Sequence, residues 1–572
     1  MCKRIAISLM ASCLMFIAQA QKIVHREILS RPTDRSITLL CSFDQDVEVC
    51  ARYGTSSGAY TRQTPWILFV KDSLTEILME PLGQDTRYYY QLCYRKPGQT
   101  NEIYRPQGTF HTQRSPGKQF SFVIQADPHL DDFSDTALYR RCLKNELEDS
   151  PDFMIDLGDI FMSDKLKVGK ENITHDTVTW RVKYMRSFYE EVCHSLPLYL
   201  VLGNHEGEAG WQLNNTSQNV AVFDAVDRKK YFKNPAPDNF YSGDDANYTF
   251  MGKRESYYSW TWGDALFVVL DPYFFTSIKP DTLNGWRWTL GKDQYDWLRN
   301  TLETSDARFK FVFCHQLVGG DPLGRGGIEY ADKYEWGGKN LDGTTGWSSN
   351  RPGWYKPIKE LLAENKVTIF FHGHDHFFAK QDKDCLIYQL VPQPSLPNFN
   401  GPNQAAEYGY FQGKILPNSG HLRVTVGPLG VLTEYIKVYL PSQETGARHN
   451  KDIAASYYIP ENYCYDTLFT NTPVLWNADY GRELIYPNPS CGEIKIEFSL
   501  AEEKIIYLDL FDHQGRRLRR LIDGQKITPQ KYEVFWDGRD DRSQEQLSGT
   551  YYYKLYSTDG LISGGKLVWI AP

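Results

Sequence analysis

The chain has 572 residues, of which 41% are hydrophobic and 23% are charged. A chain of this length is too long to fold around one hydrophobic core. A typical domain size of about 150 residues predicts three or four domains. The formal net charge is -8 at pH 7, so no general attraction to nucleic acid or to anionic membranes is expected. An aromatic content of 14% favours strand-rich domains, because aromatic rings fit half-buried pleated surfaces.

The first 20 residues have the pattern of an export signal. Lys3 and Arg4 precede an apolar run that is too short to span a bilayer, and an A-x-A cleavage pattern ends at Ala20. We therefore predict a signal peptide over residues 1–20. A lipoprotein signal that ends at Cys13 is the alternative. No later stretch is long and apolar enough to predict a transmembrane segment.

Residues 22–113 are predicted to form an all-β module. Short strand-like runs, such as residues 36–43 and 88–94, are separated by turn sequences at the spacing of a β-sandwich. Residues 82–90 resemble the strand-entry signature of fibronectin type III domains. Export permits disulfides, and Cys41 and Cys50 form one candidate pair; the alternative is that most cysteines are small buried hydrophobic residues.

From residue 118 to residue 445 the pattern changes to alternating strands and helices, with apolar runs such as 120–124 and 309–314. Helix-like segments lie between them, for example over 136–148 and 293–304, which predicts a layered α/β domain. Residues 446–480 show no clear periodicity and are predicted to be a connector.

The last part of the chain, residues 484–572, is again all-β in pattern. Its sequence passes through Tyr486-Pro487-Asn488-Pro489 and Trp536-Asp537-Gly538-Arg539-Asp540. This order resembles the C-terminal sorting domains of the type IX secretion system and the related immunoglobulin-like fold of flagellar hook-capping proteins. The resemblance implies that secretion machinery is a partner, and that the protein is secreted or held at the surface of a bacterium.

Five polar motifs each follow an apolar run of the α/β region: Asp127-Pro128-His129, Gly158-Asp159, Gly203-Asn204-His205-Glu206, Cys314-His315 and Gly373-His374-Asp375-His376. One such motif alone is weak, but five in this order predict a metal site. In an extended chain, residues two apart point the same way, so the first Asp and His of this set are expected to face one ion. Imidazole and carboxylate groups suit zinc, manganese and iron. Asp159 is the natural bridging carboxylate, and Asn204 offers a neutral amide oxygen.

With these motifs, the chain resembles the calcineurin-like metallophosphoesterase superfamily over about residues 118–440. The resemblance implies a first metal held by Asp127, His129, Asp159 and His376, and a second held by Asp159, Asn204, His315 and His374. It also implies that His205 contacts the leaving-group oxygen and that Glu206 orients His205. His372 is expected to be a core residue or to support a ligand.

One position departs from the purple acid phosphatases, which this domain order otherwise resembles. Those enzymes place a metal-binding tyrosine three residues after the bridging aspartate, where this chain has Met162. The site should therefore lack the colour that an iron–tyrosinate pair produces.

The glycine-rich loop after His315 is expected to shape the choice of substrate. Arg325 and Arg351 lie in this loop and could bind a phosphate through two nitrogen atoms. The alternative is that both arginines are structural.

Together these patterns predict a multidomain chain, with a central α/β metallophosphoesterase sandwich flanked by two all-β sandwich modules. The expected activity is hydrolysis of phosphate esters by water that two divalent metal ions (Mn, Zn or Fe) activate, with a proton donated by His205. Phosphomonoesters are the first choice. The alternatives are a phosphodiesterase acting on nucleotides, nucleic acid or phospholipid, and a catalytically dead adhesion protein.

Overall fold

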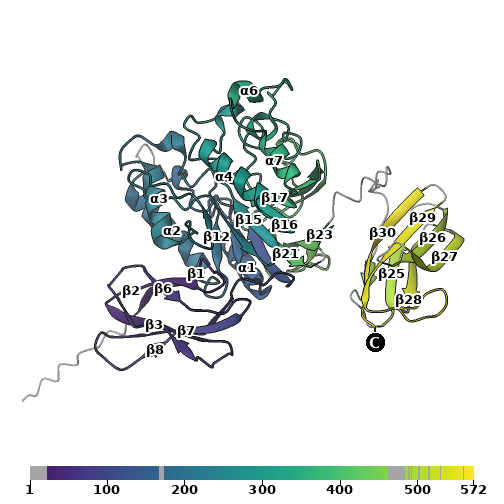
Figure 1. The fold of residues 1–572 in the computed structure, drawn as a ribbon, viewed down its shortest axis with the longest axis horizontal. Coiled ribbons are helices and arrows are strands. Elements are labelled where there is room, and N and C mark those ends of the chain that lie inside the picture. Colours follow the sequence, from purple (N-terminus) through teal and green to yellow (C-terminus); the bar gives the residue numbers. More distant parts are fainter. Residues whose placement is uncertain are drawn as a thin grey trace, which may run out of the picture. The chain divides into compact units, whose positions relative to one another are not determined.

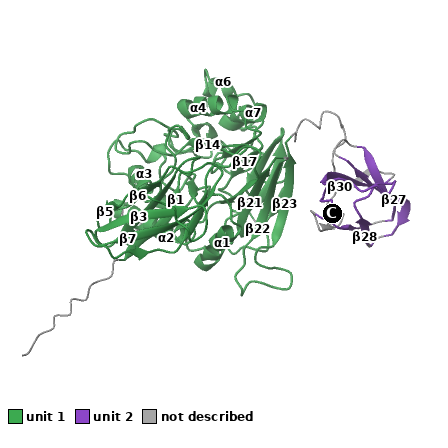
Figure 2. Ribbon diagram, turned by 60° about the horizontal axis from the view of Figure 1, so that its bottom comes forward, with its two compact units in different colours: residues 1–464 green, residues 465–572 purple. Residues whose placement is uncertain are grey.

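The computed structural model describes residues 22–166, 173–402, 404–428 and 430–461, and, in the last part of the chain, residues 484–486, 490, 492–499, 503–512, 516–528, 530–557 and 560–571. The chain divides into two compact units, Met1–Cys464 and Tyr465–Pro572 (Figure 2). The predicted signal peptide lies outside the described residues. No helix of the described part is long and apolar enough to cross a membrane.

The beginning of the first unit is all-β, as predicted (Figure 1). A three-stranded sheet has the order β1-β2-β6, with β1 at Ile23–Ser30, β2 at Ile37–Phe43 and β6 at Thr75–Met79. The second sheet is built on β3 and β7 and has these members: β3 (Val47–Gly54), β4 (Arg62–Gln63), β5 (Ile67–Phe69), β7 (Arg87–Arg95), β8 (Ile103–Tyr104) and β9 (Gly108–His111). Leu39, Val49 and Phe110 belong to one buried cluster between the sheets. The fibronectin type III resemblance stays a prediction.

This β-rich part is joined directly to the α/β part of the same unit. The backbone N–H of Leu29 donates to the carbonyl of Cys193 at 2.9 Å, and the Tyr90 hydroxyl donates to the carbonyl of His194 at 2.8 Å. The buried Arg186 guanidinium donates to the Leu40 carbonyl at 3.2 Å. These bonds explain why residues 22–113 belong to the larger compact unit rather than to a separate one.

The predicted Cys41–Cys50 disulfide is wrong. Both residues are free and buried, and Cys50 lies opposite Cys93 in the register of β3 and β7. Burial in strand cores favours the alternative that these cysteines act as small hydrophobic residues. Cys385 is the described cysteine that forms a disulfide.

The α/β part is a sandwich of two sheets. The six-stranded sheet has the order β12-β11-β10-β21-β22-β23, with these bounds: β10 (Phe120–Gln125), β11 (Met154–Asp156), β12 (Leu198–Leu200), β21 (Gly420–Gly427), β22 (Gly430–Lys437) and β23 (Ile453–Pro460). The eight-stranded sheet has the order β13-β14-β15-β16-β17-β19-β18-β20, with these bounds: β13 (Ser242–Gly243), β14 (Tyr258–Trp262), β15 (Ala265–Val269), β16 (Phe309–Phe313), β17 (Ile369–His372), β18 (Phe378–Lys383), β19 (Leu386–Leu390) and β20 (Lys414–Leu416). β10, β11 and β12 run parallel, as do β15, β16, β17 and β19.

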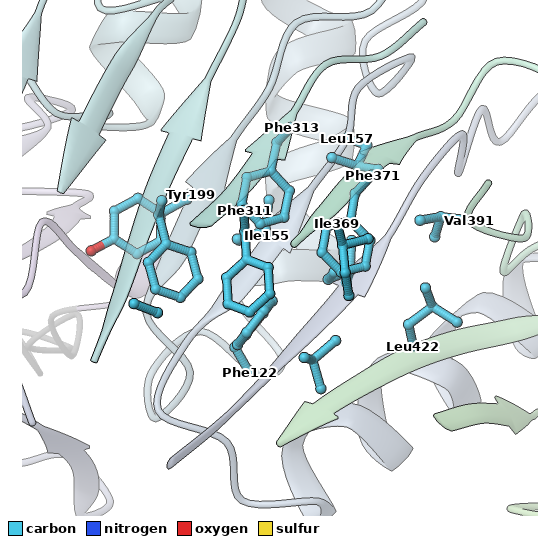
Figure 3. Close-up of a cluster of buried hydrophobic side chains, with 14 of the residues drawn as sticks. Phe122, Ile155, Leu157, Tyr199, Phe311, Phe313, Ile369, Phe371, Val391 and Leu422 are labelled. Carbon is cyan, nitrogen blue, oxygen red and sulfur yellow. The ribbon is translucent and has the colours of Figure 1, made fainter. Parts of the chain in front are cut away.

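A dense aromatic core joins the inner faces of the two sheets. Phe122 of β10 lies 5.6 Å from Phe311 of the other sheet, measured between ring centroids, and both are fully buried. Figure 3 shows these rings with Phe313, Phe371 and Leu422 between the strands. Period-two alternation in the strands explains this arrangement, because one side of each strand faces the other sheet.

The helices of the α/β part have these bounds: α1 (Thr136–Glu148), α2 (His175–Tyr189), α3 (Val220–Tyr231), α4 (Lys292–Glu303), α5 (Tyr334–Gly337), α6 (Trp347–Asn350) and α7 (Ile358–Glu364). The helix predicted over 136–148 is confirmed at both ends. The Asp135 side chain begins it by accepting hydrogen bonds from the N–H groups of Ala137 and Leu138. The helix predicted over 293–304 is α4, one residue earlier in the chain.

The predicted connector over 446–480 begins too early. β23 lies within this range and pairs antiparallel with β22, at the edge of the six-stranded sheet. Its residues are mostly exposed or half-buried, with Ala455 and Ile459 buried. An edge strand with one weakly apolar face lacks the apolar run that marks the inner strands, which explains the error. Residues 462–480 lie outside the described part.

The second unit is all-β, as predicted. One sheet has the order β24-β25-β28, and the other has the order β27-β26-β29-β30. Their bounds are β24 (Leu484–Tyr486), β25 (Ile494–Ser499), β26 (Lys504–Phe511), β27 (Arg517–Ile527), β28 (Lys531–Trp536), β29 (Gly549–Ser557) and β30 (Gly560–Trp569). Trp536 and Trp569 belong to its buried core, with ring centroids 5.3 Å apart.

Candidate metal centre

Polar residues follow the carboxyl ends of parallel strands in both sheets. Asp127 follows β10, Asp159 follows β11 and Asn204 follows β12; in the facing sheet, His315 follows β16 and two more histidines follow β17. Carboxyl ends of parallel strands meet at one edge, which brings these loops together. Six predicted ligands form two groups, with ligand atoms within 4.8 Å of one another in each: Asp127, His129 and His376, and Asp159, His315 and His374.

The ligand atoms face one another at distances that suit coordination rather than hydrogen bonding. Oδ1 of Asp127 lies 3.8 Å from Nε2 of His129 and 3.5 Å from Nε2 of His376. Oδ2 of Asp159 lies 3.5 Å from Nε2 of His129 and 3.4 Å from Nε2 of His315. Hydrogen bonds are shorter than this, whereas two ligands each about 2.0–2.2 Å from one ion lie about 3–3.5 Å apart. Asp159 therefore has one oxygen between a histidine of the first group and a histidine of the second.

Buried polar atoms without partners support the same interpretation. Among the described residues, Nε2 of His129, His315 and His374 and Oδ1 of Asn204 are buried and have no hydrogen-bond partner. An unpaired polar atom away from water is costly, so such a group of atoms requires another occupant. Imidazole nitrogens and carboxylate and amide oxygens are suitable donors for divalent zinc, manganese or iron, so these residues fit the implied ions.

The carboxylates dominate the electrostatics of this cluster. Burial lowers the pKa of His315, but the charges of Asp159 and Asp127 outweigh burial and raise this pKa to about 10. Burial raises the pKa of Asp127, but His315, His129 and His376 outweigh it and hold this pKa well below its usual range. The fully buried carboxylates thus require positive charge beside them, which protonated imidazoles or metal ions can supply.

The backbone of the ligand loops is left-handed rather than extended. Asp127, His129, Asp159, His374 and His376 have φ values of 57°, 47°, 58°, 76° and 64°. The expected extended geometry of the two-residue spacing is therefore wrong, although Asp127 and His129 do belong to one ligand group. His374 and His376, which the same spacing would aim at one ion, belong to different groups. Such φ values are uncommon outside glycine and cluster at functional sites. Gly158, at φ 102°, allows a close approach of two loops: a Cβ there would lie 2.3 Å from the backbone nitrogen of Gly203.

Nearby groups orient the imidazoles. Nδ1 of His315 donates to the Leu157 carbonyl at 2.9 Å, which directs Nε2 toward Asp159. Nδ1 of His129 lies 3.3 Å from Oδ2 of Asp131. Hydrogen bonds of this kind fix the tautomer of a metal-binding histidine.

His205 is placed beside the ligands, but Asp164 rather than Glu206 contacts its ring. Nδ1 of His205 lies 2.9 Å from Oδ1 of Asp164, and the ring centroids of His205 and His129 are 6.1 Å apart. His205 belongs to neither ligand group. Its half-buried ring leaves the other nitrogen able to meet a substrate.

Glu206 was predicted to orient His205, and the structure contradicts this. Its carboxylate is fully buried and accepts hydrogen bonds from the backbone N–H groups of Gly203, Asp159, Ile160 and Phe161. The two oxygens of a carboxylate can accept hydrogen bonds from several N–H groups. Glu206 thereby pairs the backbone donors that come together where these two loops meet. Glu206 therefore fixes the backbone of the loops that carry Asp159 and Asn204. It does not orient His205, the predicted proton donor.

The two loop arginines have different environments. Arg351 donates to Glu335 at 2.5 Å and to the carbonyls of Trp286 and Trp288, so the structure contradicts a substrate-binding role and favours the structural alternative. Arg325 donates to Oδ1 of Asp375 at 3.0 Å, and its side chain remains 27% exposed. Asp375 stands between two predicted ligands in the sequence, so Arg325 lies at the edge of the site.

His372 matches its predicted place in the core, whereas the predicted absence of colour at Met162 stays a prediction. His372 is fully buried, belongs to neither ligand group and stacks on Phe370, and burial lowers its pKa to about 3. Met162 is also buried. A nearby tyrosine is Tyr273, whose ring centroid lies 6.3 Å from that of His315. Its hydroxyl donates to Gln316 at 3.1 Å.

Three supporting residues were not predicted from the sequence. Asp131 and Asp164 lie two and five residues after predicted ligands, within the same loops, and proximity in the sequence was their only signal. Arg181 of α2 is buried and donates to the carbonyls of His129 and Phe161, which joins two ligand loops. Its only sequence signal was its place on a helix next to apolar residues, so only the fold identifies it.

Comparisons with known proteins agree with this geometry. Residues 120–378 match the family model of calcineurin-like phosphoesterases. Among solved structures, the chain is similar to PhoD, with 16% identity and a TM-score of 0.53, over 76% of this chain and 90% of that chain. At this identity the similarity supports the fold alone.

Two further structures have TM-scores too low to support any inference. One is GAP50, the anchor in the inner membrane complex of Plasmodium, with 13% identity and a TM-score of 0.31 over 59% of this chain and 90% of that chain. The other is FlgD from P. aeruginosa, with 20% identity and a TM-score of 0.12 over 15% of this chain and 71% of that chain. The comparison with curated proteins found no match.

The family match covers every strand whose carboxyl end carries a predicted ligand, from β10 to β17. The PhoD similarity extends beyond the matched residues and supports the same fold. Residues 120–378 are therefore a calcineurin-like phosphoesterase domain, and this family, together with the candidate metal-binding groups, supports a metal-dependent phosphoric ester hydrolase.

Proposed function

We propose that the protein is an exported phosphomonoesterase that uses two divalent metal ions. The observation that carries the two-ion proposal is the position of Asp159 Oδ2, 3.5 Å from His129 Nε2 and 3.4 Å from His315 Nε2. One histidine belongs to each ligand group, so a single carboxylate oxygen serves both. A shared carboxylate between two N/O ligand sets is the arrangement of dinuclear hydrolytic sites.

Each residue has a separate task in the proposed reaction. Two bound ions supply an activated water and withdraw charge from the phosphoryl oxygens. Asp127, His129 and His376 would hold one ion, Asn204, His315 and His374 would hold the other, and Asp159 would serve both. His205, oriented by Asp164, donates a proton to the departing alkoxide oxygen.

Phosphomonoesters are the preferred substrates in this proposal. The support is the domain order, with a β-sandwich before the catalytic domain, as in the purple-acid-phosphatase-like proteins that the sequence resembles. This support is an analogy of architecture rather than of pocket shape. Hydrolysis of diesters, and the absence of any turnover in a dead adhesion protein, are the alternative outcomes of the test below.

Arg325 is the remaining candidate for substrate orientation. It stacks on the Tyr408 ring at 4.0 Å and is tied to Asp375, so its guanidinium is held at the edge of the site. We expect Arg325→Met to raise KM for phosphate esters. Arg351→Met is the matched control, which should lower stability instead, because Arg351 serves the loop.

Export is supported by the signal-like residues 1–20 and by the sorting-like sequence of residues 484–572. Truncation before Leu484 in the native host should spare phosphate release and block delivery to the surface or medium. Unchanged delivery of the truncated protein would remove the sorting role.

A phosphate-release screen tests the activity. Purified full-length protein is stripped of metal, reloaded with manganese, zinc or iron, and assayed on alkyl and aryl monoesters and on diesters. The expected result is release from monoesters that depends on added metal and is lost in Asp159→Asn, together with bound metal. Faster release from diesters would select the phosphodiesterase, and no release from any ester with metals bound would select the dead protein.

A further inference from the structure

A second cluster of metal-binding side chains lies outside the two ligand groups of the candidate centre. Cys142 and Glu146 are one turn apart on α1, and His421 lies on β21 of the six-stranded sheet. All three are fully buried. Sγ of Cys142 lies 3.6 Å from Oε1 of Glu146 and 3.7 Å from Nδ1 of His421.

The orientation of His421 is fixed by Asp149. Nε2 of His421 lies 2.9 Å from Oδ2 of Asp149, and Asp149 is ion-paired with Arg423 and Lys451, each at 3.1 Å. A carboxylate that is already paired with two cations is ionised, so it accepts the Nε2–H of the imidazole. The lone pair of Nδ1 then faces Cys142 and Glu146, as in histidines that bind metal through one nitrogen and a carboxylate through the other.

The carboxylate of Glu146 has no positively charged partner among the described residues. No ion pair of Glu146 occurs in the described part of the chain, and its Oε2 atom is buried with no hydrogen-bond partner there. Burial, followed by the charge of Asp156, raises the pKa of Glu146. A carboxyl group in this position requires either a proton or a cation, and a proton alone leaves one buried oxygen unpaired.

We propose that Cys142, Glu146 and His421 bind a structural zinc-type divalent ion, distinct from the two ions of the catalytic site. Ligands of a tetrahedral zinc ion, at about 2.3 Å for sulfur and about 2.0–2.1 Å for nitrogen, lie about 3.5 Å apart, close to the contacts of Cys142. A thiolate and a carboxylate together balance a dication. The ion would fasten α1, which follows the Asp127 loop, to the central sheet.

Cobalt substitution tests this site without relying on turnover. The full-length protein is loaded with Co²⁺, and its near-ultraviolet spectrum is recorded for the wild type, Cys142→Ser and Cys41→Ser. The proposed ligands of the catalytic centre are nitrogen and oxygen atoms, so Cys142 is the one proposed ligand that can give a thiolate-to-cobalt charge-transfer band. We expect the band in the wild type and in the buried-cysteine control Cys41→Ser, and its loss in Cys142→Ser. Zinc content should fall by one equivalent in Cys142→Ser, which should retain metal-dependent phosphate release.

A second measurement covers the case in which Cys142→Ser fails to fold. X-ray absorption of the zinc-loaded wild type should show a sulfur scatterer at about 2.3 Å. The proposal is overturned if the wild type shows neither the cobalt band nor the sulfur scatterer. Equal zinc content in wild type and folded Cys142→Ser would overturn it as well. Neither result bears on the two-ion catalytic site, because that site uses none of these residues.

Discussion

The His205 imidazole is hydrogen-bonded to the Asp164 carboxylate, with 2.9 Å between Nδ1 and Oδ1. A carboxylate that accepts the Nδ1 proton holds the ring in one orientation. The remaining nitrogen is then available as a proton donor beside the ligand His129. In the reaction that we propose, this pair is the general acid, and His205 belongs to neither ligand group.

His205→Ala should therefore retain both catalytic ions and turn over slowly. General-acid help is worth about 10²–10⁴-fold, so hydrolysis of an alkyl phosphate should fall by that factor. An aryl phosphate should suffer little, because a phenolate leaves without a proton. Kinetics on both esters and metal analysis check this. Equal losses on both esters, with metals retained, would show that His205 is not the acid.

Asp164→Asn should weaken the same step through His205. A supporting hydrogen bond of this kind is worth about 10–100-fold, again mainly on alkyl esters. In the double variant with His205→Ala, the second substitution should cost almost nothing more. Asp131→Asn is the matched control, because Asp131 supports the ligand His129 and should lower metal affinity instead. Additive losses in the double variant would contradict the pairing.

Glu206→Gln should destabilise the fold rather than alter proton donation. An amide has one oxygen where the carboxylate has two, so some of the four backbone donors lose their acceptor, at about 1–3 kcal/mol for each. Urea unfolding measures the loss, with the exposed Glu191→Gln as the control. A stable Glu206→Gln variant that slows only alkyl esters would restore the role first predicted for Glu206.

The sequence predicted which candidate ligands come together better than it predicted the contacts around them. The motifs Asp127-Pro128-His129 and Gly373-His374-Asp375-His376 were visible because each follows an apolar inner strand, and the two sheets bring them together. The contacts of Asp164, Glu206 and Arg181 depend on how loops distant in the sequence meet, which periodicity does not encode. β23 was not predicted because it is an edge strand, and its few buried apolar residues do not form a recognisable pattern in the sequence.

Iron-loaded protein should show no strong tyrosinate band in the visible range. Met162 occupies the position that carries tyrosine in the purple enzymes, and the hydroxyl of Tyr273 is engaged with Gln316. An absorption spectrum of the iron-loaded wild type checks this. A visible band that disappears in Tyr273→Phe would contradict it.

The central claim is that two ions share Asp159, and anomalous X-ray diffraction from crystals of the manganese-loaded protein tests it most directly. We predict two anomalous peaks about 3.5–4 Å apart on either side of the Asp159 carboxylate, one beside Asp127, His129 and His376 and the other beside His315 and His374. A single peak at this site, or two peaks without Asp159 between them, would contradict the account.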